Sequence, residues 1–159
     1  SAKNVIFVGT RPAIAPLIQE AAMNSNSHYV NTRWVGGLLT NWSTMSMCLE
    51  KLTRLDAQLE NAVPQKGFTK KDILSLSKER ERLEKFFGGL RDLKGLPDLL
   101  VIVGQPNERN AVLECEKLNI PTITLLDSNC DPTSVAYGIP ANDDSARSVA
   151  FILDHLTKA

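Results

Sequence analysis

Four aspartates in two loops have the clearest potential for chemistry. Asp127 and Asp131 lie in "DSNCDP" (127–132), and Asp143 and Asp144 lie in "PANDD" (140–144). Carboxylate oxygens at the carboxyl ends of parallel strands could bind magnesium. Aspartates in such loops more often form Asx turns and cap the following helix. We therefore expect no metal, and we keep an α/β enzyme that binds a metal or small ligand through these loops as the alternative.

Other catalytic chemistry has less support in the sequence. Cys130 lies near no histidine that could act as its base, and the three cysteines form no CxxC pair. Neither GxxxxGK[ST] nor GxGxxG occurs, so nucleotide binding is not indicated. No apolar run is long enough to span a membrane. We expect no catalytic residue, no cofactor, no small-molecule substrate and no membrane contact.

The charge is unevenly distributed, although the net charge is zero. Residues 1–44 carry three basic and one acidic side chain, and residues 45–94 carry eleven basic and eight acidic ones. Residues 95–159 carry four basic and nine acidic side chains. This asymmetry favours one face that meets a polyanion. A solvated charged surface is the other interpretation, and charge alone does not choose between them.

Apolar runs alternate with amphipathic segments along most of the chain. The runs that predict strands cover residues 4–9, 28–30, 96–104, 120–127 and 137–140. Helical spacing covers residues 11–24, with Pro12 in the first turn, and residues 108–119 and 144–156. This alternation predicts a parallel sheet with helices on both faces.

A heptad pattern interrupts this alternation. Its apolar positions recur at intervals of three and four from Met45 to Ala62 and from Ile73 to Leu90, with Arg80 as the one misfit. "VPQKGF" (63–68) separates the halves, and Thr69 with Asp72 resembles a capping box. We predict an antiparallel coiled-coil hairpin at 43–90, inserted into an α/β domain formed by 1–42 and 91–159.

Both tryptophans lie at the junction "RWVGGLLTNW" (33–42), where the second strand leads into the hairpin. A structural corner explains them best. Trp34 and Trp42 would be mostly buried, Gly36 or Gly37 would permit a backbone that a side chain strains, and Asn41 would cap the helix. The alternative is a platform on which RNA bases stack.

"RWVGGLLTNWSTM" (33–45) closely resembles a motif of the small-subunit ribosomal protein S-two family. "GLPDLLVIV" (95–103) and residues 108–144 resemble later segments of the same family. The resemblance implies a flavodoxin-like sheet of five strands in the order 2-1-3-4-5 with a protruding coiled-coil hairpin. It also implies a non-catalytic constituent of the small ribosomal subunit, located between head and body. The implied partners are ribosomal RNA and neighbouring proteins, and no homo-oligomer is expected.

Basic residues of the first-strand loop, the corner and the hairpin are the candidates for phosphate contact. They are Arg11, Arg33, Lys51, Arg54, Lys66, Lys70 and Lys71. Departures from the family pattern at Pro12, Gly104 and Ala141 indicate an organellar protein. We favour the mitochondrial matrix, with a bacterial or plastid ribosome as the alternative, and expect an upstream segment that the sequence does not include.

Overall fold

The computed structural model describes residues 4–62 and 67–159. Its centre is one sheet of five parallel strands in the order β2-β1-β3-β4-β5. The strands are β1 (Val5–Val8), β2 (His28–Val30), β3 (Leu99–Ile102), β4 (Thr122–Leu126) and β5 (Tyr137–Pro140). This order is the flavodoxin-like one that the sequence predicts. β1 and β3 are neighbours, so the chain reverses its direction of winding between them.

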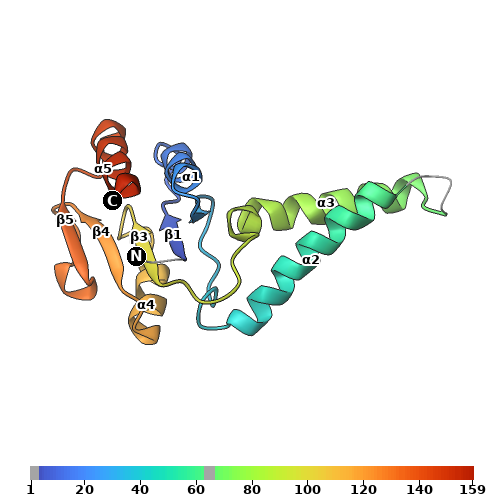
Figure 1. The fold of residues 1–159 in the computed structure, drawn as a ribbon, viewed down its shortest axis with the longest axis horizontal. Coiled ribbons are helices and arrows are strands. Elements are labelled where there is room, and N and C mark those ends of the chain that lie inside the picture. The colour runs from blue at the N-terminus through green and yellow to red at the C-terminus, as the bar shows by residue number, and fades with distance from the viewer. Residues whose placement is uncertain (1–3, 63–66) are drawn as a thin grey trace.

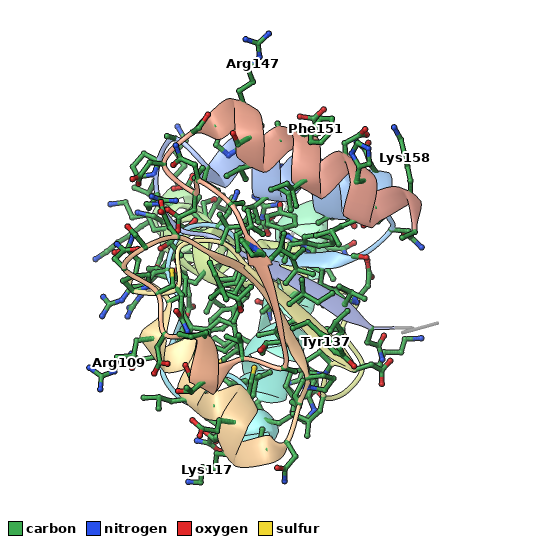
Figure 2. The ribbon with its side chains drawn as sticks, turned by 90° about the vertical axis from the view of Figure 1, so that its left-hand side faces the viewer. Arg109, Lys117, Tyr137, Arg147, Phe151 and Lys158 are labelled. Carbon is green, nitrogen blue, oxygen red and sulfur yellow. The ribbon has the colours of Figure 1, made fainter. Side chains whose placement is uncertain are left out.

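Helices cover both faces of the sheet (Figures 1 and 2). α1 (Ala15–Asn24) and α5 (Ala146–Lys158) lie on one face, and α4 (Arg109–Leu118) lies on the other. Alternate residues of each strand point to opposite faces. Phe7 and Val101 therefore join the core under α1 and α5, while Ile6 and Ile102 join the core shared with α4.

The first helix begins later than the sequence predicts. α1 starts at Ala15 rather than near residue 11, and Pro16 occupies its first turn. Pro12 lies in a preceding turn, in which the backbone N–H groups of Ile14 and Ala15 both donate to the carbonyl of Arg11. The loop after β1 is thereby long enough to carry Thr10 and Arg11 to the carboxyl edge of the sheet.

Two long helices replace an ordinary crossover between β2 and β3. α2 (Trp42–Asn61) and α3 (Lys70–Phe87), which we call the helical arm, lie side by side and extend away from the sheet (Figure 1). A 3₁₀ turn, η2 (Gly88–Leu90), follows α3. The predicted capping box is confirmed, since Asp72 N donates to Thr69 Oγ1 at 3.1 Å and Thr69 N donates to Asp72 Oδ2 at 3.0 Å.

The apolar seam of the arm is most deeply buried near the sheet. Leu52 is fully buried and Phe87 is 6% exposed, and both belong to the same core cluster as Ile6. Leu59 and Leu76, farther along the arm, are only half-buried. The arm therefore shares its base with the sheet core, and the division into two domains remains a prediction.

Arg80 interrupts the seam because it forms an ion pair across the arm. Its Nε donates to Asp56 Oδ1 at 2.8 Å, and Arg91 also donates to the Asp56 carboxylate. Arg91 donates to Glu84 as well, so the pairs link α2, α3 and the segment after η2. These hydrogen bonds, from Arg91 and then from Arg80, lower the pKa of Asp56. The misfit in the heptad pattern is thus a polar contact at the edge of the seam.

Candidate nucleic-acid interface

One carboxylate from α4 holds the junction between β2 and the arm. The indole Nε1 of Trp34 and the backbone N–H of Gly37 donate to Glu114 Oε1 at 3.1 and 2.8 Å. The backbone N–H groups of Leu39 and Thr40 donate to Oε2 at 2.9 and 3.1 Å, and the Thr40 hydroxyl donates at 3.3 Å. We call residues 33–42 the corner. Glu114 satisfies a set of donors there that would otherwise lie partly buried without acceptors.

The charge of Glu114 is stabilised by these donors. Burial by itself raises the pKa of the carboxyl, but the hydrogen bonds from Trp34, Leu39, Thr40 and Gly37 outweigh it and hold the pKa below its usual value. Sequence reasoning missed this residue. The sequence could have indicated it, because Glu114 lies at helical spacing from Ala111 and therefore on the buried face of α4. A charged side chain on a buried face requires hydrogen-bond or ion-pair partners.

The predicted roles of three corner residues can be compared with the structure. Trp34 is 6% exposed, as expected, and Gly37 has a φ of +84°, which a side chain would strain. Gly36 is exposed, and its φ is not positive. Trp34 and Gly37 thus have the burial and the backbone conformation expected of a corner, and the corner role itself stays a prediction.

The start of α2 differs from the prediction in one respect. Trp42 packs against the core cluster and is partly exposed, which does not contradict the expectation that it is mostly buried. Asn41 does not cap the helix with its side chain, and its Oδ1 instead accepts a hydrogen bond from Thr44 Oγ1 at 3.0 Å. A capping residue is normally extended, whereas Asn41 has φ −121° and ψ 51°.

A groove of about 900 Å³ lies where the sheet, the corner and the arm meet. Thr10 and Glu108 line it from the loops after β1 and β3, and Arg33 lines it from the corner. Lys51 and Arg82 line it from α2 and α3. The groove thus lies at the carboxyl edge of the sheet, next to the point where the winding reverses, which is the usual place for a ligand in this architecture.

The groove holds two cations that have no carboxylate partner in the described part of the chain. Arg33 and Arg82 are exposed, and neither forms an ion pair with a carboxylate of the described residues. Lys51 pairs with Glu79, so its charge is balanced within the arm. Arg33 is one of the predicted phosphate contacts, whereas sequence reasoning missed Arg82.

Glu108 lines the same groove from a buried position. It is 2% exposed, and its Oε1 accepts hydrogen bonds from the backbone N–H of Thr10, at 2.8 Å, and from the Thr10 hydroxyl. Burial raises the pKa of the Glu108 carboxyl, against the opposing effect of Thr10 and Arg11.

The remaining candidates on the arm differ in their surroundings. Arg54 lies 3.6 Å from Glu50 in an exposed pair, which contributes little to stability. Lys70 and Lys71 are exposed in the first turn of α3, at the end of the arm far from the sheet. Lys66 lies outside the described residues. None of these positions contradicts a phosphate contact, and all of them stay predictions.

Arg11 has partners within the chain. Its Nη1 lies 2.9 Å from Asp144 Oδ1, and its Nη2 lies 3.6 Å from Asp143 Oδ1 and also donates to the carbonyl of Asp143. The guanidinium therefore ties the loop after β1 to the loop after β5. A phosphate at Arg11 would have to compete with two carboxylates, so Arg33 and Arg82 are the better placed cations.

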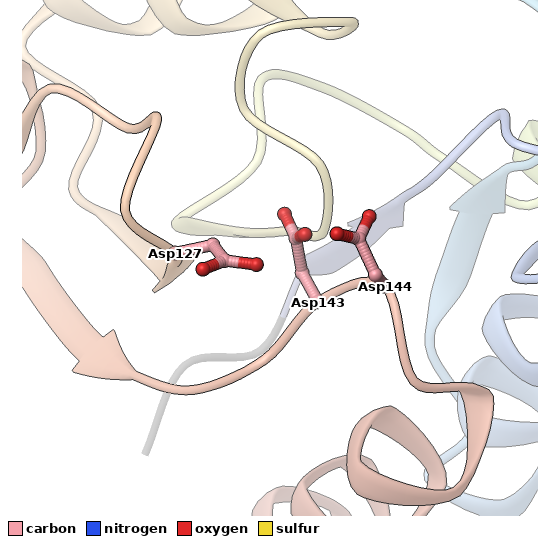
Figure 3. A group of neighbouring side chains, drawn as sticks. All are labelled: Asp127, Asp143 and Asp144. Atoms are coloured by element: carbon pink, nitrogen blue, oxygen red, sulfur yellow. The ribbon is translucent and has the colours of Figure 1, made fainter.

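Three of the four aspartates singled out from the sequence lie together (Figure 3). One carboxylate oxygen from each of Asp127, Asp143 and Asp144 lies within 4.8 Å of the others. Asp131 is not among them, because its Oδ1 accepts from Thr133 N at 2.9 Å in an Asx turn. Burial raises the pKa of Asp143, Arg11 opposes this, and Asp127 and Asp144 add to it. Since Arg11 supplies a positive charge to this cluster, an ion pair between the loops accounts for the proximity of these carboxylates.

The sequence of the chain is similar to that of known proteins along its whole length. The family model described as "Ribosomal protein S2" matches residues 1–159. A protein of Ostreococcus tauri named "Small ribosomal subunit protein uS2c" is 85% identical over 158 residues, which are 99% of this chain and 70% of that protein. A "Small ribosomal subunit protein uS2" of Rhizobium rhizogenes is 44% identical over 155 residues, which are 98% of this chain and 60% of its own length.

The comparisons correct the expected compartment. The relative that is 85% identical is a chloroplast uS2c, and the Rhizobium rhizogenes relative is bacterial, so the preference for a mitochondrial protein was wrong. Among the described residues, no helix combines the length and apolarity needed to cross a bilayer.

The match of the family model to the whole chain and the identity to these relatives show that the chain belongs to the ribosomal protein S2 family.

Proposed function

We propose that this protein is a structural, non-catalytic constituent of the small ribosomal subunit, most consistent with a plastid ribosome. It binds ribosomal RNA and neighbouring ribosomal proteins in the region between the head and the body of the subunit. Family membership and the names of the relatives support the ribosomal role. The RNA contact, the position in the subunit and the compartment are parts of the proposal.

The observation that carries the RNA contact is the placement of unpaired cations. Arg33 and Arg82 have no carboxylate partner among the described residues and share one groove. Lys70 and Lys71 add two exposed charges toward the end of the arm. Phosphate groups attract such cations, and the release of counterions makes the binding depend on salt.

The opposite end of the molecule has a different character. Tyr137 on β5 and Phe151 on α5 are 64% and 65% exposed, and both belong to the acidic segment 95–159. They lie on the side seen in Figure 2, away from the arm. Exposed aromatic side chains are enriched where proteins meet. We assign this side to neighbouring proteins rather than to RNA.

Binding to small subunits depleted of this protein tests the RNA contact. We would compare the parent with a triple Arg33→Ala, Lys70→Ala, Lys71→Ala variant by cosedimentation at several salt concentrations. Each lost phosphate contact should reduce the log–log salt slope by about one unit, so the triple variant should lose about three. Arg147→Ala is the matched control, since it removes an exposed cation on α5 that pairs with no carboxylate among residues 4–62 and 67–159. An unchanged slope in the triple variant would contradict the proposal.

A further inference from the structure

We propose that the groove between the corner and the arm receives one unpaired nucleotide of RNA. Its base lies against Phe86, and its phosphate pairs with Arg33 and Arg82. This inference rests on the proposed function and adds to it, because phosphate contacts alone require neither a groove nor an unstacked base.

The size and the walls of the groove fit a nucleotide. Sites for small organic molecules usually enclose about 300–1,000 Å³, and the groove encloses about 900 Å³. Leu83 and Phe86 line it from α3 and are only partly buried against the core, so they retain exposed apolar surface. A base that leaves its helical stack can recover stacking on such an aromatic side chain.

Polar groups suited to the edge of a base also form part of the wall of the groove. Asn107 and Asn110 line it, and neither side-chain amide has a hydrogen-bond partner in the described part of the chain. Glu108 Oε1 is taken by Thr10, while Oε2 accepts no hydrogen bond from the described residues. An amide both donates and accepts, so this wall can match any base.

The charges of the groove favour an anion over a cation. Lys51 and Glu79 cancel each other, which leaves Arg33 and Arg82 against the buried carboxyl of Glu108. Lys85 does not line the groove, but its Nζ lies 5.9 Å from the centroid of the Phe86 ring and so adds a positive charge near that wall. An apolar wall, a polar wall and excess positive charge together correspond to a base that carries a phosphate.

The corner keeps this arrangement rigid. Trp34 lines the groove, but its indole N–H is already bonded to Glu114, so Trp34 contributes shape rather than a free donor. Arg33 precedes it directly and is exposed. Because Glu114 holds the backbone from Gly37 to Thr40, the position of Arg33 relative to the arm is fixed before RNA binds.

The test measures the affinity of the full chain for two RNA probes by fluorescence anisotropy. One probe is a single-stranded octauridylate, and the other is an octamer with the same backbone that lacks every base. The two probes carry the same phosphates, so the comparison isolates the bases. The parent should bind the intact octamer about 5- to 150-fold more tightly, which corresponds to stacking of one base. Phe86→Leu keeps an apolar side chain but removes the aromatic ring. In this variant the ratio of the affinity for the intact octamer to that for the octamer without bases should fall toward one. Phe151→Leu, on the opposite side of the molecule, should leave the preference unchanged.

Arg82→Ala provides a second measurement that does not disturb the core, because Arg82 is exposed. Its affinity for the intact octamer should fall about tenfold through loss of one charge-assisted hydrogen bond, whereas Arg147→Ala should retain the parent affinity. Equal binding of both octamers by the parent would overturn the nucleotide proposal and leave phosphate binding standing. Failure of both octamers to bind would contradict the RNA contact itself.

Two further outcomes would overturn the inference. One is a Phe86→Leu variant that folds and keeps the full preference for bases. The other is evidence that a ribosomal protein, rather than RNA, occupies the groove. In an Arg82→Cys variant, protection of the new thiol from alkylation by ribosomal proteins, but not by RNA, would assign the groove to a protein partner.

Discussion

The side chains of Trp34 and Glu114 are joined by a hydrogen bond of 3.1 Å, although they are 80 positions apart in the sequence. The same carboxylate also binds the backbone of Gly37, Leu39 and Thr40. One residue of α4 therefore fixes the conformation of the segment that carries Arg33 and leads into the arm. The geometry of the proposed RNA site depends on this contact.

Glu114→Ala should destabilise the protein strongly. Two of the donors that it satisfies, Trp34 Nε1 and Leu39 N, are buried, and each buried donor without an acceptor costs about 1–3 kcal/mol. We expect the free energy of unfolding to fall by at least about 2 kcal/mol, measured by urea denaturation. Glu116→Ala, at an exposed position of the same helix, should change it by less than about 0.5 kcal/mol. Equal stability of the two variants would contradict the role assigned to Glu114.

The same carboxylate should make stability sensitive to acid. Its folded-state pKa is below the unfolded value near 4.5, so the unfolded state binds the proton more readily. The stabilisation is complete above the unfolded pKa and is lost as the pH falls through the folded pKa. As the pH falls from above the unfolded pKa through the folded pKa, the free energy of unfolding should therefore decline more steeply for the parent than for Glu114→Gln, in denaturation curves at several pH values. Parallel pH profiles would show that Glu114 is not the responsible group.

Leu52→Ala and Leu83→Ala should differ in their effects on stability. Leu52 is fully buried, so its truncation should cost about 2–5 kcal/mol. Leu83 is half-buried and lines the groove, so its truncation should cost clearly less. Thermal melting followed by circular dichroism measures both variants. A Leu52→Ala variant that melts like the parent would show that the seam has been assigned incorrectly.

The two tryptophans should also be unequal. Trp34 is buried and bonded to Glu114, so Trp34→Ala should cost about 3–5 kcal/mol. Trp42 is half-buried, so Trp42→Ala should cost less and leave a folded protein. Melting of each variant, compared with its incorporation into depleted subunits, separates folding from RNA contact. If the folded Trp42→Ala variant fails to assemble, Trp42 is part of a stacking surface, the alternative that we ranked lower.

Much of the fold could be predicted because its signals are local. Alternating apolar runs and helical spacing gave the strands and helices, and the capping pair Thr69 and Asp72 marked the start of α3. The strand order came from the family resemblance, and the structure agrees with it. The start of α1 was missed because Pro12 and Pro16 both suit a first turn, and only the turn at Arg11 decides between them.

The site was predictable only in part, because its contacts join distant segments. Arg33 and Lys51 were chosen for their charge, but nothing local indicates that Lys51 pairs with Glu79 or that Arg11 pairs with Asp143 and Asp144. Arg82 was missed because its neighbours in the sequence are also charged. The proximity of Asp127 to Asp143 and Asp144 likewise depends on the order of the strands.

A density map of the small ribosomal subunit that contains this chain tests the central claim most directly. The proposal predicts RNA phosphates within hydrogen-bonding distance of both Arg33 and Arg82, along the groove between the corner and the arm. A map in which RNA runs elsewhere, while both guanidinium groups face solvent or another protein, would contradict the account.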